Sequence, residues 1–96
     1  MTEEICCVTV NEFDRFKRLM EVSVRRSPVA ALLTTEWHGT TYRATAPGVA
    51  AVGRFHNGEV RVRIIISFPA TLMRDTIVSD IQRTLRESGC SNLRSG

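Results

Sequence analysis

The sequence predicts an α+β fold: a mainly antiparallel sheet with two helices packed on one face, in the order β-α-β-β-β-β-α. Two patterns predict this fold, a hairpin that leads directly into a helix over residues 48–85 and a strand followed by a helix over residues 3–26. With 96 residues, of which 43% are hydrophobic, the chain suits one core. We expect a single α+β domain over residues 1–89 and a frayed C-terminal tail over residues 90–96, where no apolar periodicity is found.

The hairpin is the clearest element. Residues 60–68 place apolar side chains at every even position, which predicts a strand with one buried face. Asn57 and Gly58 suit the two positive-φ positions of a type I′ turn, so residues 49–56 are expected to return as the partner strand. This turn sets the register and places small residues of the first strand opposite bulky residues of the second.

The helix that follows is predicted from a stripe at every fourth residue: Met73, Ile77, Ile81 and Leu85. Ser67 and Pro69 indicate its start, and Gly89 indicates its end. Arg74 falls inside the apolar stripe. Two interpretations remain open for it, a frayed first turn or a contact with an anion.

The first strand is predicted over residues 3–10, followed by a helix that starts with Asn11 as N-cap and ends near Arg26. Strands over residues 29–37 and 40–46 are then expected, with a turn at His38-Gly39. In this arrangement every aromatic residue falls on a core face: Phe13, Phe16, Trp37, Tyr42, Phe55 and Phe68.

The opposite face of the sheet is expected to be basic. Its predicted rows are Glu36–Thr41–Arg54–Arg61 and Thr34–Arg43–Val52–Arg63, with Ile65 nearby. The candidate binding residues on it are Arg43, Arg54, Arg61, Arg63, Ile65 and Val52. The face is either a solvated surface, an interface for a partner protein, a second copy or an anionic surface, or a nucleic-acid site. The last is disfavoured because the aromatic residues needed for base stacking are expected in the core.

Composition and the absence of known motifs indicate which classes of function to expect. The net charge is +3, and eight arginines lie from Gly39 onward, so an anionic partner would meet the C-terminal half. We find no metal-ligand cluster, phosphate loop or nucleophile motif, and His38 and His56 lie at predicted turns. We therefore expect no enzymatic activity, no cofactor and no bound metal.

The compartment is expected to be the cytoplasm. Glu3 and Glu4 stand where a signal peptide would carry positive charge, and no apolar run is long enough to form a transmembrane segment. The odd number of cysteines, three, favours free thiols in a reducing environment.

Four stretches resemble a family of small bacterial proteins, the polyhydroxyalkanoic acid system proteins. They are Glu36-Trp37-His38-Gly39, Pro47-Gly48-Val49, Val60 to Ile64, and the repeat Ile77, Ile81, Leu85. The resemblance covers about half the chain and implies a non-enzymatic interaction module at or near polyester storage granules. A nucleic-acid-binding module that uses the arginine-rich sheet face is the alternative, and a small domain of another function is the third.

Overall fold

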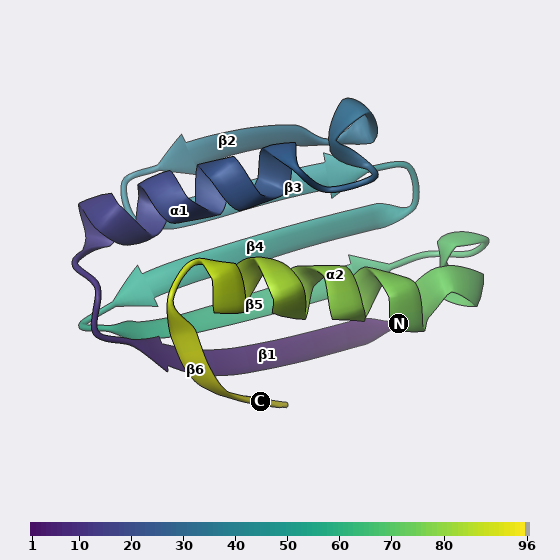
Figure 1. The fold of residues 1–96 in the computed structure, drawn as a ribbon. Helices are drawn as coiled ribbons and strands as arrows, with labels where there is room; N and C mark the ends of the chain where they lie inside the picture. The colour runs from purple at the N-terminus through teal and green to yellow at the C-terminus, as the bar shows by residue number, and fades with distance from the viewer. Residues whose placement is uncertain (96) are drawn as a thin grey trace.

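A computed structural model describes residues 1–95 of the chain. The six strands are β1 (Thr2–Thr9), β2 (Thr34–His38), β3 (Thr41–Ala46), β4 (Val49–His56), β5 (Glu59–Ile66) and β6 (Cys90–Ser95). The helices are α1 (Phe13–Arg25) and α2 (Arg74–Glu87), with 3-10 turns η1 (Ala30–Leu32) and η2 (Ala70–Met73). The strands form one antiparallel sheet in the order β2-β3-β4-β5-β1-β6, and both helices lie on the same face (Figure 1). The predicted α+β class is confirmed.

The predicted register of the central strands is also confirmed. In the β4–β5 hairpin Gly53 lies opposite Val62 and Ala51 opposite Ile64. Asn57 and Gly58 have φ angles of 50° and 77°, as the predicted turn requires. Alternate residues of β5 are buried against the helices, so the hairpin supplies much of the core.

The β3–β4 turn ties the sheet to η2. Gly48 has a φ of 77°, and a Cβ built on it would lie 2.9 Å from the Ala70 Cβ, so glycine is needed here for both conformation and space. The Ser67 N–H donates to the Gly48 carbonyl at 2.8 Å. These contacts hold η2 against the end of the sheet.

The predicted start and register of β2 are wrong. Residues 30–32 form η1, and the strand begins at Thr34 rather than Val29 because the Ser27 carbonyl and hydroxyl accept hydrogen bonds that turn the chain. Gly39 and Thr40 make the turn to β3, so Glu36 lies opposite Arg43 and not Thr41. The strand is displaced by two residues, which leaves each side chain on its predicted face.

Residues 90–95 of the predicted tail form a strand and are not frayed, while Gly96 lies outside the described residues. β6 pairs with β1, placing Cys90 opposite Thr9, and the Cys90 side chain is buried. Pairing is favourable here because β1 would otherwise leave a row of unpaired backbone groups at the sheet edge. Gly89, at a φ of 92°, allows the chain to leave α2 and enter this strand, as the predicted helix end requires.

Both helix starts differ from prediction. The N-cap of α1 is Glu12, while the Asn11 side chain donates from Nδ2 to the Ser88 carbonyl at 3.2 Å and so links the two helix ends. α2 begins at Arg74, because the Ser67–Pro69 stretch leads into η2 instead. Met73 is therefore exposed, and Phe68, predicted in the core, is 77% exposed.

In residues 1–95, neither helix has the length and apolar character needed to cross a membrane.

Candidate functional site

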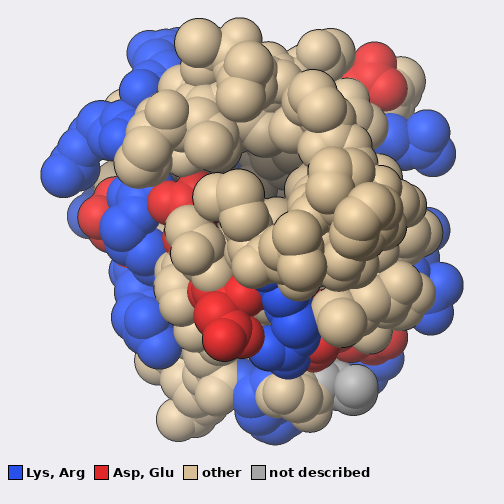
Figure 2. Space-filling model, turned by 90° about the vertical axis from the view of Figure 1, so that its right-hand side faces the viewer, with Lys and Arg blue, Asp and Glu red and all other residues tan. Residues whose placement is uncertain are grey.

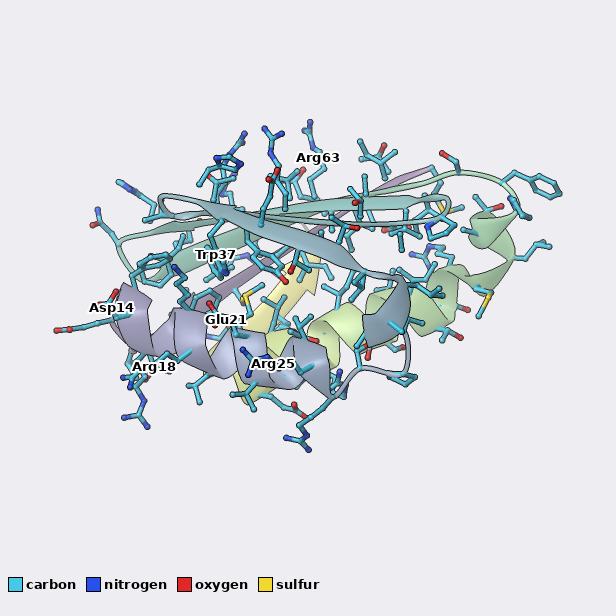
Figure 3. All side chains as sticks on the ribbon, turned by 90° about the horizontal axis from the view of Figure 1, so that it is seen from above. Asp14, Arg18, Glu21, Arg25, Trp37 and Arg63 are labelled. Carbon is cyan, nitrogen blue, oxygen red and sulfur yellow. The ribbon has the colours of Figure 1, made fainter. Side chains whose placement is uncertain are left out.

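The outer face of the sheet gathers all six predicted binding residues. Arg54 lies opposite Arg61, and Val52 lies between Arg43 and Arg63 in the next row. Arg63 points away from the helices in Figure 3, whereas Trp37 points toward α1. Ile65, which lies opposite Ala50, is 48% exposed.

Acidic side chains offset part of this basic face. Arg61 donates from Nε to Glu59 Oε1 at 3.3 Å, and Arg63 Nη2 lies 3.9 Å from Glu4 Oε2. Both arginines of these pairs are exposed, so each pair contributes little to stability. The face offers an anion a shallow basic surface rather than an enclosed site.

The helix side of the sheet holds an apolar cavity of about 340 Å³. Small residues of β3 and β4 form its floor: Ala44, Ala46, Ala51 and Gly53. Met20 and Val24 of α1 line one wall, and Ile77 and Ile81 of α2 line the other. Figure 2 views the molecule from the end that carries η1 and η2, where few charged side chains surround a hollow.

The mouth of the cavity is lined by apolar residues. Val29 and Leu32 come from the η1 segment and Met73 from η2, and all three are exposed while also lining the cavity. The two 3-10 turns therefore flank the opening. An aliphatic molecule entering here would meet carbon atoms first.

Small side chains on the sheet explain why the space is there. A close-packed interior normally fills such a layer with branched aliphatic residues, but β3 presents Ala44 and Ala46 to the helices, and β4 presents Ala51 and Gly53. Tyr42 lies opposite Gly53, as predicted, and its ring closes one end of the space. Burial raises the pKa of the Tyr42 hydroxyl, which remains neutral.

A polar cluster joins the two helices beside the cavity. Ser27 donates from Oγ to Asp80 Oδ2 at 2.9 Å, and Arg83 donates from Nη2 to Asp80 Oδ1 at 2.9 Å. Two turns after Asp80 on α2, Glu87 Oε1 accepts from Ser23 Oγ at 2.7 Å and from Arg83 Nη1 at 2.9 Å. The Ser23 hydrogen bond, followed by that from Arg83, lowers the pKa of the Glu87 carboxyl.

Arg74 is the first residue of α2, and the anions that it contacts are carboxylates of the chain itself. Its guanidinium bonds Glu3 of β1 and, at 2.7 Å, Asp75 Oδ1. The hydrogen bond from Arg74 lowers the pKa of the Glu3 carboxyl. Arg74 thereby fastens the start of α2 to the sheet.

The remaining reactive groups do not form a recognisable catalytic arrangement. Cys7 and Cys90 lie together in the core, where the hydrogen bond with Cys7, and then burial, raise the pKa of Cys90. His38 Nε2 lies 3.2 Å from Glu36 Oε1 in an exposed pair. Among residues 1–95 no three His, Cys, Asp or Glu side chains are grouped to hold a metal ion.

Sequence reasoning located the outer face but missed the cavity. The small residues on predicted core positions of β3 and β4 were visible in the sequence. Whether α1 and α2 pack closely enough against these residues to fill the space depends on the path of η1 and η2. The residue pattern of the sequence did not predict these two 3-10 turns.

No protein-family model matches the chain, and no curated protein matches its sequence. The resemblance to polyhydroxyalkanoic acid system proteins therefore depends on the spacing of the four stretches alone.

Proposed function

We propose that this protein is a non-enzymatic binding module that holds an aliphatic ligand in the cavity between its helices and its sheet. The observation that carries the proposal is the apolar cavity of about 340 Å³ with an apolar mouth. Small-molecule sites measure about 300–1,000 Å³ and have mainly apolar linings. An apolar cavity of about 150 Å³ binds benzene, which has six carbon atoms, so by volume this one has room for roughly thirteen non-hydrogen atoms.

The test is binding of a simple aliphatic probe, 1-octanol, followed by calorimetry or by chemical-shift changes. The wild-type chain is expected to bind it, and the double variant Ala44→Leu/Ala46→Leu, which fills the floor, is expected to lose most of the affinity. Ala50→Leu is the matched control, because Ala50 lies in β4 on the outer face. Absence of binding by the wild type, or equal binding by the filled variant, would refute the proposal.

The proposed setting is the surface of polyester storage granules in the cytoplasm. The resemblance supports this setting, and an aliphatic-ligand site is compatible with an aliphatic polyester. The protein is expected to co-sediment with polyhydroxyalkanoate particles, and its gene is expected near those of polyester synthesis or breakdown. Failure of both observations would remove the granule setting and leave the cavity proposal untouched.

A second candidate function belongs to the outer face. Arg54 directly opposes Arg61, a like-charge pair that the Glu59–Arg61 ion pair offsets in part and that an anion bound to this face would offset further. Nucleic acid is one such anion, and its binding must weaken steeply as salt rises. Affinity for a DNA or RNA oligonucleotide that is absent, or flat between low and moderate salt, would exclude this candidate.

The same face also presents Val52 and Ile65, which would suit a partner protein or a second copy of the chain. A homo-oligomer formed there would dissociate in the variant Ile65→Glu. Sedimentation velocity at several concentrations tests this, and a monomer at all of them would exclude self-association.

A further inference from the structure

We infer that the cavity selects a neutral aliphatic ligand, such as an alcohol or an ester, over an aliphatic carboxylate. The inference rests on the proposed function, since it concerns what the same cavity binds. Its basis is the distribution of charge around the cavity. Apolar volume alone would accept the chain of either kind of molecule.

The cavity lining contains one charged residue, and that residue is acidic. Asp80 lies on the α2 wall, and neither Lys nor Arg lines the cavity. A carboxylate group brought inside would lose its hydration and would find no cation in the lining to replace it. A neutral head group avoids both costs.

Neighbouring arginines already have acidic partners. Arg83 binds both Asp80 and Glu87, and Arg74 binds Glu3 and Asp75. Drawing either guanidinium toward a ligand would break these ion pairs, of which Arg74–Glu3 joins α2 to β1 while the others lie within α2. A ligand carboxylate therefore gains no cation without an equal loss.

A cationic head group is not favoured either. The Asp80 carboxylate accepts hydrogen bonds from both the Ser27 hydroxyl and the Arg83 guanidinium. Its charge is thus already compensated within the protein. The polar lining that remains includes Thr76, an exposed residue of α2 whose hydroxyl can donate to or accept from a neutral oxygen.

The test compares three probes of similar length by isothermal titration of the full chain at pH 8: 1-octanol, methyl octanoate and octanoate. We expect the alcohol and the ester to bind, and octanoate to bind at least about tenfold more weakly. If none of the three binds, the proposed function itself fails. If the neutral probes bind and octanoate binds as tightly, the selectivity inference is overturned while the proposed function stands.

A second test changes the charge of the cavity wall and measures the affinity for octanoate. Thr76→Lys places an ammonium group on the cavity wall and is expected to raise octanoate affinity toward that of the ester. Ser79→Lys is the matched control, because Ser79 is an exposed residue of the same helix outside the cavity lining. An equal gain in the two variants would mean that net charge decides octanoate binding, which contradicts the inference.

Discussion

Filling the cavity floor should stabilise the protein, which is unusual for a core substitution. Ala44→Leu adds three carbon atoms at a position that faces the cavity. At about 0.8 kcal/mol per buried methylene, the variant should gain roughly 2 kcal/mol of unfolding free energy if the new side chain occupies the empty space. In a filled core the same change would instead cost about 1–3 kcal/mol through overpacking.

The sign of the change therefore decides whether the cavity exists in solution. Urea denaturation of the ligand-free protein measures it, with an unchanged m-value required for a simple interpretation. Ala50→Leu controls for strand propensity and added hydrophobicity, because Ala50 lies on the outer face opposite Ile65. We expect that control to stay within about 0.5 kcal/mol of wild type.

Destabilisation of Ala44→Leu beside a neutral Ala50→Leu would refute the reasoning. It would mean that α1 and α2 settle onto β3 and β4 in solution and leave no space for a ligand. A stabilised Ala44→Leu that also loses 1-octanol binding would link the same volume to both stability and function.

Three further predictions concern the sheet, the C-terminal strand and the helix pair. Arg61→Glu should change the unfolding free energy by no more than about 1 kcal/mol, whereas Ile64→Ala should cost about 2–5 kcal/mol; equal damage in urea would indicate a sheet buried on both faces. Truncation after Gly89 removes β6 with its buried Cys90 and should lower stability by about 2–4 kcal/mol in urea, and an unchanged midpoint would mean that the tail is dispensable. Because the pKa of Glu87 is lowered on folding, its stabilising contribution should be complete above roughly pH 4.5 and lost as the pH falls further. Glu87→Gln should flatten that part of the stability curve, and an unaltered acid dependence would contradict the role given to the Ser23 and Arg83 hydrogen bonds.

Local patterns were sufficient for the elements whose causes are local. The alternation along β5 and the Asn57-Gly58 turn determined the hairpin, and the Pro47-Gly48 turn continued the register into β3. The outer face followed directly, because a correct register assigns each side chain to a face. Even the displaced β2 kept its faces, since its shift was by two residues.

Features that depend on distant partners required the tertiary structure. β6 forms because β1 needs an edge partner, although residues 90–95 show no strand alternation of their own. Arg74 finds Glu3 at the other end of the chain, and Asn11 bonds Ser88 instead of capping its own helix. Each of these contacts joins residues more than 70 positions apart, which no local pattern encodes.

The cavity depends both on local sequence, which sets the size of its floor residues, and on the tertiary structure, which sets the distance between the helices and the sheet. Sequence alone determined that Ala44, Ala46, Ala51 and Gly53 are small and share the helix-facing side of two adjacent strands. Only the tertiary structure decided that the space above them remains open. The turns η1 and η2 lie at the rim of the sheet. The polar cluster of Ser27, Asp80 and Arg83 connects the two helices beside the cavity. Side-chain volume is a property of each residue, whereas empty volume is a property of the distances between elements.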